Sequence, residues 1–420
     1  MKKLCLLALP ILVLTSCGGS SEKDGGQDSS GNTIVKVMFH VDGQSEEGMA
    51  YKKRINAFNS AYKSQKIKAS ADFVARTQGT TSYEQVLISM KQEGTLPSII
   101  TFDSPNCSTY AHYKLVVNVD DVFTEEEKNE FITLNRYQGK TYGIPIQESS
   151  AGFYYNKTIF AEAGIDVSGY TVENPWTFDQ FKDVCRRLKD HGVATPVDMR
   201  LDATRDETAT YLLYPFIYAA GGDFVDENGK VTGHLNSNAS KRGFQFFKDL
   251  VTNGYTSYSV GATDFFTGKA GMYLSSGWTI PDLLHKYKKN RDEWGLLPYP
   301  KDVTAASATG SWSYGLTKDT EAGRALLKWL STPESAQVIT DATGMIPAHK
   351  TLGNDYEINS AEYVLRKQLE LSGTPRPEMV GYSKFSAYFA NIINGIYNQE
   401  VNGVVDSFTS SLQTELDKIK

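Results

Sequence analysis

The sequence predicts an α/β protein made of two successive units, each with its own strands and helices. Three observations lead to this prediction. A β-rich run at 34–41 is followed by apolar residues at helical spacing, and strands and helices then alternate along the chain. The same alternation restarts near residue 148. With 420 residues, the chain also exceeds what one ordinary hydrophobic core accommodates.

The first unit has the pattern of three strands separated by helices. We expect the strands at 34–41, 67–74 and 96–103, where β-branched and aromatic residues are frequent. Between them, apolar residues recur at helical spacing from Tyr51, and 81–84 has the form of a helix capping box. Such alternation predicts a parallel sheet covered by helices on both faces. Ligands of these sheets bind beyond the carboxyl ends of the strands, where His40, Asp42 and Asp103 fall.

The second unit begins with a strand at 153–157. A helix follows, capped at 177–180, with an apolar face of Phe181, Val184, Cys185 and Leu188. Further elements are a helix with Phe244, Phe247 and Leu250, and strands at 270–274 and 294–297. The last quarter is mostly helical, and Pro333 has the first-position placement that is typical of a helix start.

Residues 1–16 have the layout of an export signal. Lys2 and Lys3 precede an apolar stretch at 4–14, which is too short to span a bilayer. The sequence Leu-Thr-Ser-Cys at 14–17 resembles the lipobox of bacterial lipoproteins, in which processing alkylates the cysteine and cleaves before it. We therefore expect a lipoprotein signal peptide at 1–16 and a lipidated Cys17. The alternative is a plain export signal with an incidental cysteine.

Residues 17–32 are expected to form a flexible linker. After Cys17 they contain no apolar residue that could offset the entropy of ordering. The linker would hold a folded body at the outer face of the cytoplasmic membrane, or facing the periplasm if the host has an outer membrane. No other stretch of the sequence has the pattern of a membrane-spanning helix.

Charge and cysteine content exclude several functions. The net charge is −6, so no basic surface favours nucleic acid or anionic lipid, and the membrane contact is expected from the acyl chains alone. Beyond Cys5 and Cys17, only Cys107 and Cys185 remain. Cys185 lies on an apolar helix face and is interpreted as a small core residue rather than half of a disulfide.

Several segments together resemble a known family. In order they are 96–100 with Asp103, 142–145, 154–160, 163–165, 176–179, 220–222, 266–272, 294–298, 315–316 and the helix that carries 328–330. Each segment alone is weak, but their order and spacing cover nearly the whole mature chain. The set resembles the family 1 extracellular solute-binding proteins, the group of maltose-binding and related oligosaccharide-binding proteins.

The resemblance implies a periplasmic-binding-protein-like fold: two α/β lobes with a hinge and a ligand cleft between them. Lobe 1 would comprise 33–147 plus about 305–350, and lobe 2 would comprise 148–304 plus about 351–420. The implied function is that of a monomeric substrate-binding subunit of an ABC importer, which delivers a mono- or oligosaccharide to the permease. The resemblance implies no enzymatic activity, no cofactor and no metal.

A sugar site needs flat aromatic rings for stacking and planar polar groups for paired hydrogen bonds. The candidate ligand-binding residues are Asp42, Tyr83, Asp103, Glu148, Trp278, Trp312 and Arg376. Trp278 and Trp312 lie among Gly and Ser residues that indicate loops, whereas Trp176 and Trp329 are expected to be structural. Each charged candidate has the alternative of being a solvated loop residue, and Tyr83 that of core packing.

Three other classes of function stay open at this stage. A secreted glycosidase would need two carboxylates across the scissile bond, such as Asp103 and Glu148, but no catalytic motif supports an enzyme. The same transport role for a polyamine, glycerol phosphate or a peptide is a second alternative. Phosphate would require several cleft Arg or Lys residues, and a polyamine an acidic cleft with aromatic walls. A surface adhesin on the same fold is the third.

Overall fold

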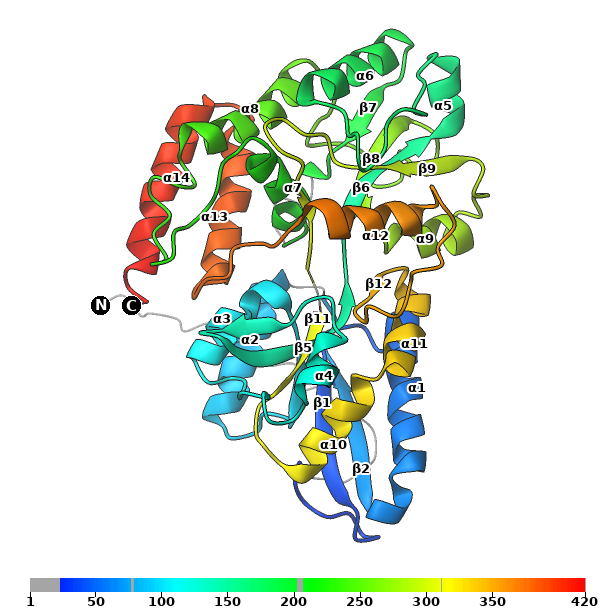
Figure 1. The fold of residues 1–420 in the computed structure, drawn as a ribbon. Coiled ribbons are helices and arrows are strands. Elements are labelled where there is room, and N and C mark those ends of the chain that lie inside the picture. The colour runs from blue at the N-terminus through cyan, green and yellow to red at the C-terminus, as the bar shows by residue number, and fades with distance from the viewer. Residues whose placement is uncertain (1–22, 77–78, 202–206, 311, 420) are drawn as a thin grey trace, which may run out of the picture.

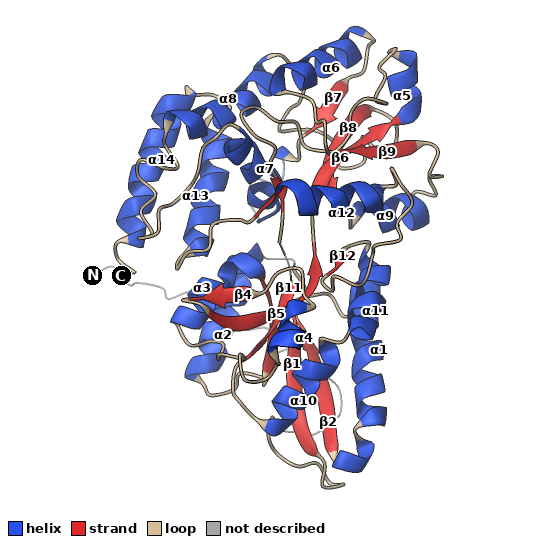
Figure 2. Ribbon diagram, viewed as in Figure 1, coloured by secondary structure: helices blue, strands red, loops and turns tan. Residues whose placement is uncertain are grey.

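The computed structural model describes residues 23–76, 79–201, 207–310 and 312–419. The predicted signal peptide at 1–16 and the predicted lipidation site Cys17 lie outside these residues. The chain forms two α/β lobes, as the sequence predicts, joined by crossing segments (Figure 1). In each lobe the strands form a sheet with helices packed around it (Figure 2).

Lobe 1 contains a seven-stranded sheet in the order β12-β5-β11-β3-β1-β2, with β4 paired to β5. The strands are β1 (Thr33–Phe39), β2 (Ile67–Phe73), β3 (Ile99–Asp103), β4 (Asn135–Tyr137), β5 (Lys140–Glu148), β11 (Trp312–Leu316) and β12 (Ile346–Pro347). The helices are α1 (Glu46–Ala61), α2 (Gly79–Gln92), α3 (Cys107–His112), α4 (Glu125–Asn129), α10 (Glu321–Leu330) and α11 (Pro333–Thr343). The three strands predicted for the first unit are confirmed, and α2 begins at Gly79, ahead of the expected cap.

Lobe 2 is built on a four-stranded sheet in the order β7-β8-β6-β9. Its strands are β6 (Ala151–Asn156), β7 (Thr195–Asp198), β8 (Ala270–Ser276) and β9 (Trp294–Leu297), with β10 (Ser307–Ala308) and β13 (Gly373–Thr374) paired separately. The helices are α5 (Lys157–Glu162), α6 (Phe178–Asp190), α7 (Glu207–Ala219), α8 (Asn238–Thr252), α9 (Thr279–Pro281), α12 (Ala361–Ser372), α13 (Tyr382–Gly395) and α14 (Val401–Leu416). The predicted capping box of α6 is present, with Thr177 and Gln180 each bonded to the other's backbone N–H.

The three strands predicted for the first unit are parallel, but the complete sheets are mixed. In lobe 1, β1 is parallel to β2 and β3 as expected, but β11 is antiparallel to both β3 and β5. The reason is topological: β11 enters lobe 1 from lobe 2 rather than through a helix of its own lobe, so it runs in the opposite direction. In lobe 2, β6 is antiparallel to β8 and β9.

The chain passes between the lobes at three places: between β5 and β6, between β10 and β11, and between β12 and α12 (Figure 1). The second passage lies close to β11, because Ser307–Ala308 still pairs with Gly373–Thr374 of lobe 2. The return of the chain to lobe 1 therefore falls near residue 312, several residues after the expected boundary at about 305.

The ordered body begins before β1. Residues 25 and 26 exchange backbone hydrogen bonds of 2.8 Å with Ile34, and Asp24 accepts a hydrogen bond from the Lys36 N–H at 2.7 Å. Asp24 also forms an ion pair with Lys318. Composition alone placed this segment in the flexible linker, but its polar groups have partners in lobe 1, so ordering needs no apolar burial of its own.

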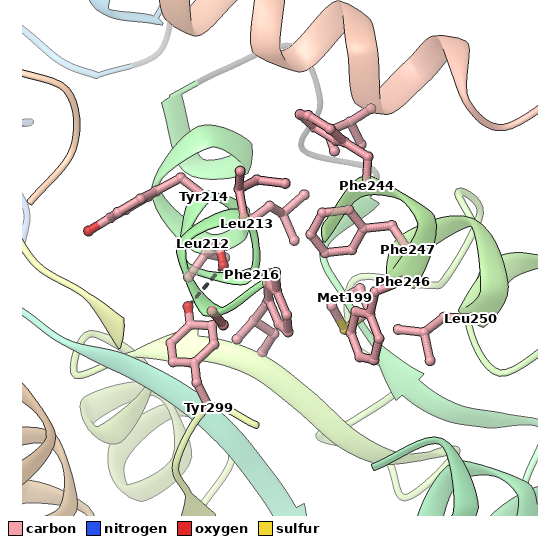
Figure 3. Close-up of a cluster of buried hydrophobic side chains, with 14 of the residues drawn as sticks. Met199, Leu212, Leu213, Tyr214, Phe216, Phe244, Phe246, Phe247, Leu250 and Tyr299 are labelled. Carbon is pink, nitrogen blue, oxygen red and sulfur yellow. Dashed lines mark hydrogen bonds between the residues drawn. The ribbon is translucent and has the colours of Figure 1, made fainter. Parts of the chain in front are cut away.

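Lobe 2 has the larger core, in which aromatic rings from α7 and α8 interlock (Figure 3). Phe216 stacks on Phe246 with centroids 5.3 Å apart, and Tyr299 donates a 2.9 Å hydrogen bond to the Leu212 carbonyl. Cys107 and Cys185 are buried and free, and Cys185 packs in this core as predicted. Across the part of the chain that the structure describes, no helix combines the length and apolar character of a membrane span.

Candidate functional site

A cavity of about 660 Å³ lies between the two lobes. Lobe 1 contributes the strand ends and loops around His40, Asp42, Arg76, Asp103, Gln147 and Trp312, and lobe 2 contributes Glu207, Tyr211, Trp278 and Arg376. Five of the predicted site residues therefore line one cavity. The other two, Tyr83 and Glu148, do not line it.

Strand register explains how lobe 1 presents its side chains. Trp312 on β11 is paired with Asp103 on β3 and with Gln147 on β5. Residues directly opposite one another in neighbouring strands point to the same face of a sheet. The indole, the carboxylate and the amide consequently form one row that lines the cavity.

Glu148 was predicted to bind ligand, but it lies on the opposite side of β5 from Gln147. Successive side chains of a strand point to opposite faces of the sheet, so Gln147 and Glu148 cannot both point toward the cavity. Glu148 is 1% exposed and accepts a hydrogen bond from the Thr133 hydroxyl. Burial raises the pKa of Glu148 to about 7, although the Thr133 hydrogen bond and the charge of Arg366 oppose the shift.

This buried carboxyl should make stability depend on pH. The folded state holds the Glu148 proton more tightly than the unfolded state does. The stabilisation of the fold by this proton is therefore complete below about pH 4.5 and is lost as the pH rises through about 7. In the wild type, Glu148 should lower the free energy of unfolding by roughly 3 kcal/mol as the pH rises from about 5 to about 8, and Glu148→Gln should abolish this decrease. Denaturant titrations across this range measure the effect. The exposed control Glu126→Gln should keep the wild-type profile, and a wild-type profile for Glu148→Gln would refute the assignment.

Tyr83 supports the site from behind. It is 2% exposed and its ring stacks on His40, with centroids 4.0 Å apart and planes 5° apart. His40 itself lines the cavity and meets Trp312 edge-on at 5.4 Å. Burial, with a contribution from Arg76, lowers the pKa of His40 to about 3, so the imidazole stays neutral. Tyr83 therefore orients a lining residue instead of lining the cavity.

A buried ion network in the cavity joins the lobes. Arg376, which follows β13, donates two hydrogen bonds of 2.6 and 2.7 Å to Asp103 at the end of β3. It also donates to Glu207 at 2.6 Å, and Glu207 accepts from Ser386 at 2.5 Å and from Tyr382. Burial lowers the pKa of Arg376, but Asp103, Tyr382 and Glu207 together raise it well above its ordinary value, so it stays charged.

Two aromatic rings from opposite lobes line the cavity. Trp278 follows β8 and is 36% exposed, with its ring 5.7 Å from that of Tyr211. The backbone around it is close-packed against lobe 1, because a Cβ on Gly277 would lie 2.2 Å from the Gly344 carbonyl oxygen. Trp312 of lobe 1 has the guanidinium of Arg76 over its ring at 4.1 Å.

Asp42 lies at the edge of the cavity, in the loop that leads into α1. Its side chain is exposed and accepts a 2.9 Å hydrogen bond from the Gln44 N–H, which fixes the turn before the Ser45 cap of α1. The carboxylate therefore has a local structural role and still faces the space between the lobes.

Several lining residues were not predicted from the sequence, and three of them, Glu207, Tyr211 and Arg76, had a usable signal. Glu207 and Tyr211 are four apart on α7 and share a helix face, and Tyr211 binds Ser149 at the first crossing with a 2.8 Å hydrogen bond. Arg76 follows the end of strand β2, just as Asp42 follows the end of strand β1. Gln147 and Glu148 point to opposite faces of β5, and no local feature of the sequence shows which of the two faces the cavity.

Several polar groups of the lining are held in place by partners within the protein. Among the described residues no cluster of His, Cys, Asp and Glu has the arrangement of a metal site. The carboxylate of Asp103 is engaged by Arg376 at both oxygens, and Ser149 donates a 2.7 Å hydrogen bond to the Gly310 carbonyl. Such an arrangement supports reversible capture of a small solute between aromatic rings and fixed hydrogen-bonding groups.

Two α/β lobes, three crossing segments and a cavity between them define a two-lobed solute-binding protein. The chain belongs to the bacterial extracellular solute-binding protein family, whose model matches residues 53–364. This family membership confirms the resemblance drawn from the ordered segments.

Curated relatives and solved structures agree with the family. A putative binding protein of Brucella abortus is 24% identical over 298 residues, covering 66% of this chain and 68% of that protein. The diacetylchitobiose-binding protein DasA of Streptomyces coelicolor is 21% identical, covering 86% of this chain and 85% of its own. The structure of a cyclic α-maltosyl-1,6-maltose-binding protein from Arthrobacter globiformis superposes with a TM-score of 0.76 at 20% identity, covering 91% of this chain and 99% of that one.

Proposed function

We propose that the chain is the substrate-binding subunit of an ABC importer and captures a mono- or oligosaccharide between its lobes. The observation that carries the proposal is the pairing of Trp278 and Trp312, from opposite lobes, with fixed polar groups in one cavity. An indole ring matches the apolar face of a pyranose, and carboxylate, amide and guanidinium groups match its hydroxyls. Relatives whose names state sugar ligands, such as the diacetylchitobiose-binding protein, support the same solute class.

The proposed role is binding without chemistry. A glycosidase would need two carboxylates facing one bond, and the pair considered from the sequence does not meet this need. Asp103 is ion-paired with Arg376, and Glu148 points away from the cavity. The captured sugar would leave unaltered when the lobes separate at a permease.

The solute class is tested by thermal unfolding of the mature protein with a panel of sugars, spermidine, a peptide mixture and glycerol phosphate. A ligand at about 100 times its dissociation constant stabilises the folded state by roughly 2.7 kcal/mol, which raises Tm measurably. We expect at least one sugar to do so. A shift with spermidine or glycerol phosphate and with no sugar would overturn the sugar assignment and keep the binding fold.

We further propose that Cys17 is lipidated and anchors the monomeric protein at the outer face of the cytoplasmic membrane, with its remaining polar linker giving reach toward the permease. The motif at 14–17 supports this proposal. Mass spectrometry of the native protein should find a diacylglyceryl-modified cysteine at the mature terminus. An unmodified chain that begins elsewhere would remove the anchor from the account.

A further inference from the structure

The charges of the cavity are unequal in sign. Among the described residues, the lining contains the carboxylates of Asp42, Glu46, Glu47, Asp103 and Glu207 but only the guanidiniums of Arg76 and Arg376. Carboxylates remain in excess even when Glu207 is protonated.

Both guanidiniums are already engaged by carboxylates. Arg76 donates hydrogen bonds of 2.8 and 3.0 Å to Glu47, and its flat face covers Trp312. Arg376 is held by Asp103 and Glu207, and one of its terminal nitrogens lies so close to Gly310 that a Cβ there would approach within 2.3 Å. An anionic solute would therefore meet guanidiniums whose charge is already balanced by carboxylates.

Two carboxylates at the rim of the cavity lack such a partner. Among the described residues, Asp42 has no ion-pair partner and accepts a 2.9 Å hydrogen bond from the Gln44 N–H, and the ionisable side chain within 4.0 Å of Glu46 is the imidazole of His285 in lobe 2. Both side chains are exposed to the space that a solute enters. Like charges brought together in a partly enclosed site repel strongly, and repulsion of this kind sets specificity.

We infer that the cleft selects its solute by charge: it admits neutral and amino-substituted sugars and rejects sugars that carry a carboxylate or a phosphate. This inference rests on the proposed function and names the solute class within it. Asp42 and Glu46 are the residues that repel anions, whereas carboxylates already balance the charge of the two arginines.

Calorimetric titrations with matched disaccharides test the inference. Cellobiose, chitobiose and cellobiuronic acid form a neutral, cationic and anionic β-linked series, and maltose with its amino and uronic acid analogues forms the α-linked one. In the series whose neutral member binds, we expect the anionic member to bind at least about tenfold more weakly than the neutral member. This ratio should shrink as salt is raised, which a purely steric rejection would not do.

A double variant, Asp42→Asn with Glu46→Gln, should reduce the ratio of the affinity for the neutral sugar to that for the anionic sugar at least threefold. The control, Glu227→Gln with Asp292→Asn, changes the net charge equally at exposed residues away from the cavity and should leave the ratio unchanged. Binding of an anionic sugar within threefold of its neutral parent would overturn the inference. If no sugar binds, the proposed function fails. If, in addition, glycerol phosphate stabilises the protein and spermidine does not, selection by charge is also overturned.

Discussion

Arg376→Met should weaken ligand binding by about 100-fold or more and make the lobes separate more readily. The substitution keeps most of the side-chain volume but leaves Asp103 and Glu207 without their shared counter-charge, in a network where the Arg376 side chain is 3% exposed. Removing one partner of a buried ion pair costs about 3–5 kcal/mol. Opening of the lobes exposes the unpaired Asp103 to water and so removes part of this cost. The substitution should therefore destabilise the closed arrangement more than the open one.

Calorimetry measures the loss of affinity, and small-angle scattering measures the change in dimensions of the unliganded protein. Asp103→Asn is the matched control, since it cuts the bond between the lobes but leaves the Arg376–Glu207 pair intact within lobe 2. We expect it to shift the dimensions in the same direction and to reduce the unfolding free energy less. If Arg376→Met binds sugar and scatters as the wild type does, the network has no part in closure or binding.

Trp278→Ala should reduce sugar affinity by about 30-fold, corresponding to about 2 kcal/mol, the loss typical of removing a central aromatic residue from a binding site. Trp278 is 36% exposed, so its removal costs little core packing and should change Tm only slightly. Trp312→Ala should also weaken binding, but the interpretation is less simple because Arg76 would lose its stacking surface.

Trp329→Ala provides the opposite pattern for comparison. Trp329 lies on α10 in lobe 1, donates a 3.1 Å hydrogen bond to the Arg54 carbonyl and takes no part in lining the cavity. Its loss should lower Tm and leave sugar affinity unchanged. Unchanged affinity in Trp278→Ala would remove the stacking model from the account.

Periodicity and strand-end position predicted most of the fold. The runs at 34–41, 67–74 and 96–103 became parallel strands because β-branched residues and buried faces left few alternatives. The antiparallel β11 could not be predicted in the same way. Its partners are fixed by the return of the chain from lobe 2, which is a tertiary feature without a local pattern.

The site was predictable where position along a strand was sufficient. Asp103 and Trp312 both lie at strand ends and pair directly across the sheet. The sequence could not decide between Gln147 and Glu148, since a shift of one residue reverses the face of the sheet to which a side chain points. The network around Arg376 depends on residues about 100 to 270 positions apart in the chain, so only the folded structure brings them together.

Calorimetric titration of the mature protein with the sugar that raises its Tm most is the most direct test of the central claim. We expect one binding site per chain, recovery of the sugar unaltered after the titration, and a large loss of affinity in Trp278→Ala and Arg376→Met. Absence of binding by every sugar tested, conversion of the sugar to products, or full affinity in both variants would contradict capture of a carbohydrate between the lobes.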